Sequence, residues 1–214
     1  MTLIKSINPY TGEILSEFHS LSEKEIEEKL SAASVAFSNW KDTDFTKRAE
    51  LMEKAAKVLK DRREKYAKII SQEMGKVIKE SLAEVDKCAL VCEYYAENGA
   101  KFLEEEPISL PEGKKAKVIH QPLGTILAVM PWNFPFWQVF RFAAPTLMAG
   151  NVGVLKHASN VPQCSLAIEE LFTEAGFPTG VFQSLLIDSE ATTKLIEDDR
   201  IKAATLTGSE KAGA

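Results

Sequence analysis

The stretch 127-LAVMPWNFPFWQVFR-141 stops an apolar run at a proline and then sets one asparagine between two prolines. Each proline fixes its own φ angle and restricts the residue before it, so Asn133 has a narrow range of backbone conformations. A rigid neutral amide can stabilise a developing oxyanion, because its dipole needs no rearrangement during the reaction. The alternative is that Asn133 caps a helix beginning near Phe136.

The sequence around this stretch alternates short apolar segments with amphipathic ones. Strands are predicted over residues 125–130, 152–156, 181–187 and 201–206, and helices over residues 136–149 and 161–175, with a shorter helix through Leu195. Such alternation predicts an α/β fold in which a parallel sheet is covered by helices on both faces.

Ligands of such sheets bind beyond the carboxyl ends of the strands, and three of these ends carry notable residues. They are Pro131 to Asn133, Lys156 to Ser159, and Thr207 to Ser209. The Thr207-Gly208-Ser209 turn precedes a predicted helix, whose free N–H groups and dipole attract a phosphate. A plain helix cap explains the same residues. Lys156 ends a buried strand, so its ammonium either meets a ligand or extends to water.

The preceding half of the chain, residues 1–106, is predicted to be helical. Ser22 and Glu25 form a capping-box pattern before a run of apolar residues at helical spacing. Residues 107–121 change character, because turn residues separate two short strand-like segments. We expect a hairpin there, with a loop as the alternative.

Composition narrows the class of protein. The chain has 214 residues, 45% of them hydrophobic, with a net charge of -5. These values are ordinary for a globular domain and argue against nucleic acid as the main partner. No apolar run is long enough to span a bilayer, and MTLIKSINPY lacks the apolar core of a signal peptide. We therefore expect a cytoplasmic protein with no membrane partner.

The cysteines and histidines predict neither disulfides nor a metal site. Cys88 and Cys92 lie four apart in a helical pattern, but no histidine or second cysteine pair completes a ligand set. Cys92 continues an apolar series, and Cys164 lies within an amphipathic segment. All three are expected to be buried as small hydrophobic residues.

Several segments together resemble the NAD(P)-dependent aldehyde dehydrogenases. They are NPYTGE near the N-terminus, 73-EMGK-76, 122-PLGTILAVMPWNFPFWQVFR-141, 145-PTLMAGNVGVLKHASN-160 and 205-TLTGSEKAGA-214. The resemblance covers essentially the whole chain and is strongest to the succinate-semialdehyde dehydrogenase branch. It implies a Rossmann-like core over residues 122–214, with the hairpin as part of an oligomerisation arm. The family binds its dinucleotide without a GxGxxG fingerprint, and the sequence has none.

The resemblance also implies roles for particular residues. Asn133 matches the amide that holds the oxyanion, Lys156 the lysine that bonds the adenosine ribose, and Gly208 and Ser209 the turn beside the pyrophosphate. The full set of implied cofactor-binding residues is Met130, Pro131, Trp132, Asn133, Lys156, His157, Ala158, Ser159, Gly208 and Ser209.

Two further positions bear on specificity. Ser159 stands where NAD-preferring members often have a glutamate, and serine removes the repulsion of a 2′-phosphate. NADP is therefore expected to be accepted as well as NAD. Arg141 matches a substrate-binding arginine and would grip the distal carboxylate of a four-carbon semialdehyde. The alternative is a surface arginine paired to a nearby acid.

The resemblance implies oxidation of an aldehyde, such as succinate semialdehyde, to a carboxylic acid. That chemistry needs a cysteine nucleophile and a glutamate base, which lie downstream of the T-G-S turn in the family. None of the three cysteines matches the nucleophile. We therefore expect an incomplete cofactor-binding domain, inactive alone, from an enzyme that forms dimers or tetramers. The alternatives are a non-catalytic dinucleotide-binding or assembly module, and an aldehyde dehydrogenase with another substrate.

Overall fold

A four-stranded parallel sheet forms the centre of the molecule. The computed structural model describes residues 2–111 and 114–213, and its sheet has the strand order β7-β6-β5-β8. The strands are β5 (Thr125–Met130), β6 (Val152–His157), β7 (Phe182–Ser184) and β8 (Ile201–Leu206). This confirms the predicted parallel sheet, although β7 is shorter than expected. Met130 lies opposite His157, and Val129 opposite Leu206, so three carboxyl ends meet at one edge.

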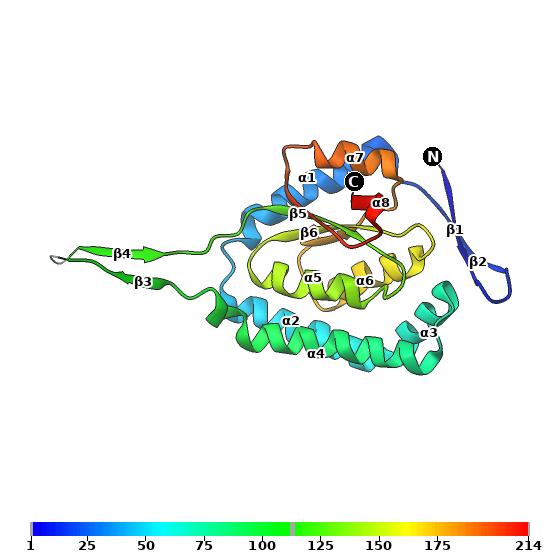
Figure 1. Cartoon of the computed structure of the whole chain (residues 1–214), viewed down its shortest axis with the longest axis horizontal. Coiled ribbons are helices and arrows are strands. Elements are labelled where there is room, and N and C mark those ends of the chain that lie inside the picture. Colours follow the sequence, from blue (N-terminus) through cyan, green and yellow to red (C-terminus); the bar gives the residue numbers. More distant parts are fainter. Residues whose placement is uncertain (1, 112–113, 214) are drawn as a thin grey trace.

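Helices cover both faces of the sheet, as predicted (Figure 1). One face carries α5 (Trp137–Met148) and α6 (Pro162–Glu174), and the other carries α1 (Glu23–Trp40) and α7 (Ser189–Ile196). The capping box predicted at Ser22 is present, with Glu25 as its partner. The short helix α8 (Glu210–Gly213) follows the T-G-S turn.

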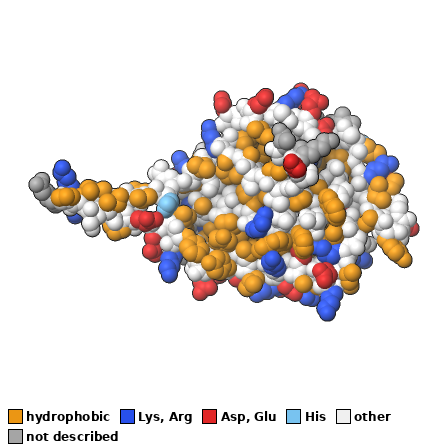
Figure 2. All heavy atoms as spheres, in the orientation of Figure 1, with side chains coloured by type: hydrophobic (Ala, Val, Ile, Leu, Met, Phe, Trp, Pro, Cys, Tyr) orange, Lys and Arg blue, Asp and Glu red, His pale blue; other side chains and the backbone are white. Residues whose placement is uncertain are grey.

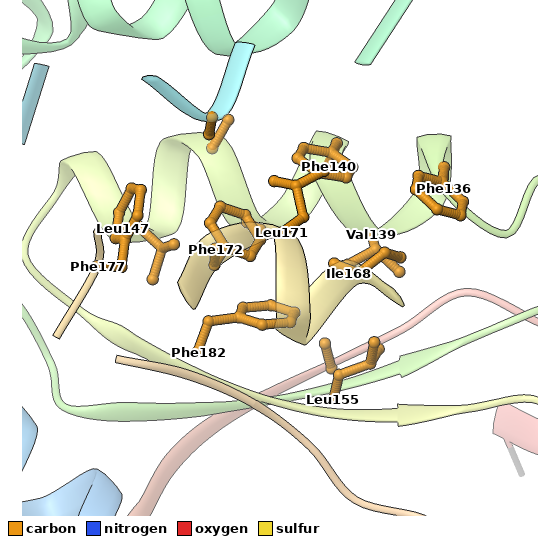
Figure 3. Packing of buried hydrophobic residues seen from close by; sticks show 14 of the residues in the cluster. Phe136, Val139, Phe140, Leu147, Leu155, Ile168, Leu171, Phe172, Phe177 and Phe182 are labelled. Atoms are coloured by element: carbon orange, nitrogen blue, oxygen red, sulfur yellow. The ribbon is translucent and has the colours of Figure 1, made fainter. Parts of the chain in front are cut away.

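A third layer packs beneath α5 and α6. It consists of α2 (Phe45–Asp61), α3 (Arg63–Met74) and α4 (Ile78–Phe102). Aromatic rings fill the space between α5, α6 and the sheet (Figure 3), with Phe172 in contact with Phe140 and Phe182 at centroid distances of 5.4 and 4.7 Å. The apolar stripes of these helices therefore join the sheet and the helical layer in one continuous core.

The helical layer also holds the C-terminus of α5. The buried guanidinium of Arg48 donates to Met148 O at 3.0 Å and to Lys41 O at 2.8 Å. A cation at this end of a helix complements the helix dipole. Gly150 follows with φ +85°, and a Cβ there would lie 2.9 Å from an Arg48 nitrogen. Only glycine fits both the backbone conformation and this close approach.

Two strands near the N-terminus were not predicted. β1 (Leu3–Ile7) and β2 (Ile14–His19) form an antiparallel hairpin, so the expectation of helix over residues 1–106 is wrong for this part. Its turn is built by Asn8, whose carbonyl accepts from Gly12 N, and by Gly12 with φ +74°. The turn residues of NPYTG indicate a hairpin here, although the flanking strands have no clear alternation of polar and apolar residues.

The hairpin predicted over residues 107–121 is confirmed. β3 (Glu106–Ser109) and β4 (Lys115–Val118) pair antiparallel and project away from the body of the molecule (Figures 1 and 2). Its expected turn includes residues 112 and 113, which lie outside the described residues. The apolar side chains of Ile108 and Val118 are exposed on this arm.

Candidate functional site

The loop after β5 and the turn after β8 line one shared hollow. Its walls are Pro131, Trp132, Asn133 and Gln138 on one side and Thr207 to Ser209 on the other, and its volume is about 240 Å³. Thr207 N donates to Val129 O at 3.0 Å, which fixes the turn against the end of β5. Two of the three predicted strand ends are therefore brought together.

Asn133 is exposed in this hollow and does not cap α5. The first backbone N–H groups of the helix are taken by another residue: Phe136 N and Trp137 N donate to Glu84 Oε1 at 2.9 and 3.0 Å. Within residues 2–111 and 114–213, the side chain of Asn133 makes no hydrogen bond. The capping alternative is therefore wrong, and the amide is free to meet a ligand.

Glu84 belongs to a buried ion pair that the sequence analysis missed. Its other carboxylate oxygen contacts Lys76 Nζ, and the two side chains are 1% and 9% exposed. The same ammonium lies 3.7 Å from the ring centroid of Phe134, the neighbour of Asn133. Lys76 is part of the motif 73-EMGK-76 noted in the sequence. No local spacing, however, connects that motif with a loop more than fifty residues away.

Glu73 performs the corresponding task for α6. Its two carboxylate oxygens accept from Gln163 N and Cys164 N, each at 2.8 Å. The N-termini of α5 and α6 are thus both occupied by buried carboxylates. In the usual dinucleotide fold a phosphate sits at such a helix start. In this protein the carboxylates of Glu84 and Glu73 occupy these positions instead. A glycine-rich turn, which lets a phosphate come close to the helix start, is therefore not needed after β5 or β6.

The end of β6 faces a second hollow. Ser159 is exposed and, with Asn160, lines a depression of about 430 Å³ shared with β1, Ile187 and Asp188. Lys156 is half-buried; its desolvation lowers the pKa of its ammonium, and the charge of Asp188 partly opposes this. The third predicted strand end therefore lies at a separate hollow from that of Asn133.

His157 and Met130 lie beneath the surface rather than in a hollow. His157 Nδ1 accepts from Ala158 N at 2.9 Å, so Nε2 carries the proton and donates to Pro135 O at 2.8 Å. Burial lowers the pKa of the imidazole to about 4 and keeps it neutral. His157 therefore ties the end of β6 to the Asn133 loop, which favours a supporting role over direct contact with a cofactor.

Arg141 projects from α5 beside the T-G-S turn. Its Nη2 donates to Thr207 Oγ1 at 3.3 Å, and no ion pair engages it among the described residues. The alternative of a surface arginine paired to an acid therefore finds no support. Gln138, one turn earlier on the helix, was not predicted. It lines the Asn133 hollow, and its Oε1 is buried without a hydrogen-bond partner in the part of the chain that the structure describes.

The cysteines are confirmed as buried free thiols. Burial raises the pKa of Cys88, Cys92 and Cys164, which disfavours a nucleophilic thiolate at any of them. In the described residues no group of three or more His, Cys, Asp and Glu side chains is placed to hold a metal ion. No helix within these residues has the length and apolarity to cross a bilayer.

Comparison with known proteins identifies the family to which this chain belongs. The model of the aldehyde dehydrogenase family matches residues 1–214, and the chain belongs to that family. A probable succinate-semialdehyde dehydrogenase [NADP(+)] of Synechocystis sp. is 53% identical over 211 residues, which are 99% of this chain and 46% of the relative. The succinate-semialdehyde dehydrogenase [NADP(+)] of Mycobacterium avium is 46% identical over 98% of this chain and 45% of its own length.

Solved structures agree with the sequence comparison. The crystal structure of succinic semialdehyde dehydrogenase from Streptococcus pyogenes, in complex with NADP+ as the cofactor, superimposes with a TM-score of 0.95 at 37% identity. The match covers 98% of this chain and 46% of that one. The fold is therefore that of the aldehyde dehydrogenases, and the chain spans about half the length of the relatives it matches.

Proposed function

We propose that the complete gene product containing this chain oxidises succinate semialdehyde to succinate with NADP or NAD. The observation that carries this proposal is the amide of Asn133, which is exposed in a hollow beside Arg141 and the Thr207–Ser209 turn and has no hydrogen-bond partner among the described residues. The names of the relatives support the substrate and the cofactor.

Asn133 in the hollow and Arg141 beside it each have a physical task in this reaction. The Asn133 amide donates to the aldehyde oxygen as negative charge develops on it, and its rigid loop supplies that donor without reorganisation. Arg141 provides a charge-assisted hydrogen bond to the distal carboxylate of the substrate. The cysteine that forms the thiohemiacetal and thioester is proposed to follow this chain in sequence, since the cysteines here are buried.

The residues present fit a dinucleotide. The T-G-S turn opens α8 beside the Asn133 hollow and suits the pyrophosphate, while Lys156 and Ser159 suit the adenosine ribose. A dinucleotide bound there would supply the acceptor for the hydride that leaves the substrate carbon during oxidation. Ser159 places no carboxylate against a 2′-phosphate, and a neighbour in structure carries NADP+. NADP acceptance is the proposal that follows.

The assembly is also a proposal. We infer that the β3–β4 arm, with Ile108 and Val118 exposed, takes part in a dimer or tetramer of the complete protein. Nucleic acid and membranes are not proposed as partners, and a cytoplasmic location stays a prediction. The 214-residue chain alone is expected to lack dehydrogenase activity.

The test is NADPH production from succinate semialdehyde by the complete gene product, with the 214-residue chain as a negative control. Replacing Arg141 with alanine is expected to lower kcat/KM for succinate semialdehyde by about 10- to 100-fold, the cost of a charge-assisted contact. An unbranched aldehyde without a carboxylate should be affected little, and Arg141→Lys should fall between. An equal loss with both aldehydes would contradict the substrate role. No turnover of any aldehyde would favour the non-catalytic module instead.

A further inference from the structure

The loop that carries Asn133 is attached to the helical layer by groups that touch no reacting atom. Glu84 of α4 accepts from Phe136 N and Trp137 N, and the carbonyl of Pro135 accepts from His157. We propose that Glu84 is a positioning residue: by fixing the start of α5 it sets the place of the Asn133 amide. This inference rests on the proposed oxyanion role of Asn133.

The start of α5 has no side-chain cap of its own. Its N-cap position is Phe136, whose side chain cannot accept a hydrogen bond. The backbone N–H groups of Phe136 and Trp137 would otherwise be unsatisfied at this helix start. One oxygen of Glu84 satisfies both, at 2.9 and 3.0 Å. A single acceptor for two successive donors defines the direction of the first helical turn.

The remaining charge of Glu84 is balanced by Lys76 in a nearly water-free setting, with side chains 1% and 9% exposed. A buried ion pair contributes little to stability compared with apolar residues of similar size, and its best-attested use is to fix one geometry. Here the cation also lies over the ring of Phe134, next to Asn133. Lys76 therefore contacts the residue next to Asn133, and Glu84 binds the backbone three and four residues after it.

The segment from Asn133 to the start of α5 is short and stiff. Pro135 has a fixed φ angle, its carbonyl is bonded to His157 at 2.8 Å, and Asn133 lies two residues before it. A shift of the helix start is therefore transmitted to the amide rather than absorbed in the loop. A displacement of about 1 Å at a reacting centre lowers a rate by about 100-fold.

Glu73 offers a matched control within the same molecule. It is equally buried and caps α6 through Gln163 N and Cys164 N. The end of β6 and the loop before α6 carry Lys156 and Ser159, respectively, rather than an oxyanion donor. Removing the Glu73 carboxylate is expected to raise the KM for the cofactor, with no energetic coupling to Asn133.

The experiment is a double-mutant cycle in the complete gene product, with kcat and KM measured by NADPH production. The Lys76→Met/Glu84→Leu pair removes both charges and the acceptor. It is expected to lower kcat by about 10- to 100-fold while KM for NADP stays within about threefold. The Lys76→Met/Glu84→Gln pair keeps an amide oxygen for the helix start and should recover most of the lost kcat.

Coupling to Asn133 decides the outcome. Added to Asn133→Ala, the Lys76→Met/Glu84→Leu pair should cost less than about threefold more in kcat, because the group it positions is gone. Fully additive losses would overturn the positioning role and leave the proposed function intact. An Asn133→Ala enzyme with unchanged kcat would overturn both the oxyanion role and this inference.

A second variant covers a failure to fold. Glu84→Asp keeps the charge and shortens the side chain by one methylene. In the Asn133→Ala background, Glu84→Asp should no longer lower kcat appreciably. Losses in kcat that add fully there would also overturn the proposal. For the control, Glu73→Leu, the losses in kcat/KM should add to those of Asn133→Ala. If Glu73 were coupled to Asn133 as strongly as Glu84, any perturbed helix start would produce the coupling, and the specific role of Glu84 would be overturned.

Discussion

The two central crossovers, β5–α5 and β6–α6, share a buried glutamate at the start of the helix but differ in whether that glutamate is paired with a cation. In each, a buried glutamate from the helical layer accepts two backbone N–H groups at the helix start. Glu73 divides its two oxygens between the two donors, whereas Glu84 gives both donors one oxygen and leaves the other for Lys76. Within the part of the chain that the structure describes, the crossover that carries the exposed Asn133 is thus the one with a buried counter-cation.

This difference shows how the same capping device can serve two purposes. A carboxylate on its own stabilises a helix start through hydrogen bonds and the helix dipole. A carboxylate in a buried ion pair is also tied to the position of its cation. At the first crossover the cation reaches the ring of Phe134, and a histidine bonds the carbonyl of Pro135. The Asn133 loop is therefore the more constrained of the two.

The largest expected effect compares the two glutamates directly. Glu84→Ala leaves Lys76 buried without its partner and should destabilise the 214-residue chain by about 3–5 kcal/mol. Glu73→Ala removes charge-assisted hydrogen bonds but leaves no buried cation and should cost about 2–3 kcal/mol. Urea unfolding of both variants beside the wild-type chain measures the difference. Equal losses would mean that the ion pair does not distinguish the two crossovers.

The second prediction concerns His157, which joins the crossovers. Its pKa in the folded state, about 4, is below the ordinary value of 6.5. As the pH falls below 6.5, the unfolded chain takes up the proton first. Stability present above that pH is therefore lost as the pH falls through the folded pKa, by about 3 kcal/mol in total.

The control for this pH effect is His157→Gln, which keeps an amide donor but does not titrate. Urea unfolding above and below the window should show a shallower loss in the variant, and the carboxylates that titrate in both proteins cancel in the comparison. Identical pH profiles would show that the histidine is not held neutral between the two loops.

The smallest expected effect concerns the second crossover alone. Ser159→Glu should move the ratio of kcat/KM for NADP over NAD by about tenfold toward NAD in the complete gene product, because the new carboxylate repels a 2′-phosphate. Ser159→Gln, which adds similar bulk without charge, is the matched control. If the glutamine variant shifts the ratio equally, size rather than charge is responsible.

The fold was predictable wherever the sequence pattern is local. β5, β6 and β8 are short apolar runs that end at turns, and their predicted bounds agree with the structure to within one residue. The hairpin β1–β2 was missed because its side chains alternate weakly and only Ser6 is buried along β1. A pattern of polarity is a weak guide to a strand that buries so few of its own side chains.

The site was predictable only in part. The position of Asn133 at a strand end followed from its prolines, and the topology brings it to Thr207 and Ser209. The roles of the individual residues stay predictions. Glu73 and Glu84 could not be found from spacing, since their hydrogen-bond partners lie 52 to 91 residues further along the chain. Only the folded arrangement of α3 and α4 beneath the sheet shows them.

The origin of the two glutamates limits how this protein can be divided. Both come from helices that precede the sheet in sequence, yet they complete the starts of two helices that cover one face of the sheet. A minimal module excised at Pro122 would begin α5 and α6 with four amide groups stripped of their acceptors. Engineers who transplant the sheet to another scaffold would therefore have to carry α3 and α4 with it.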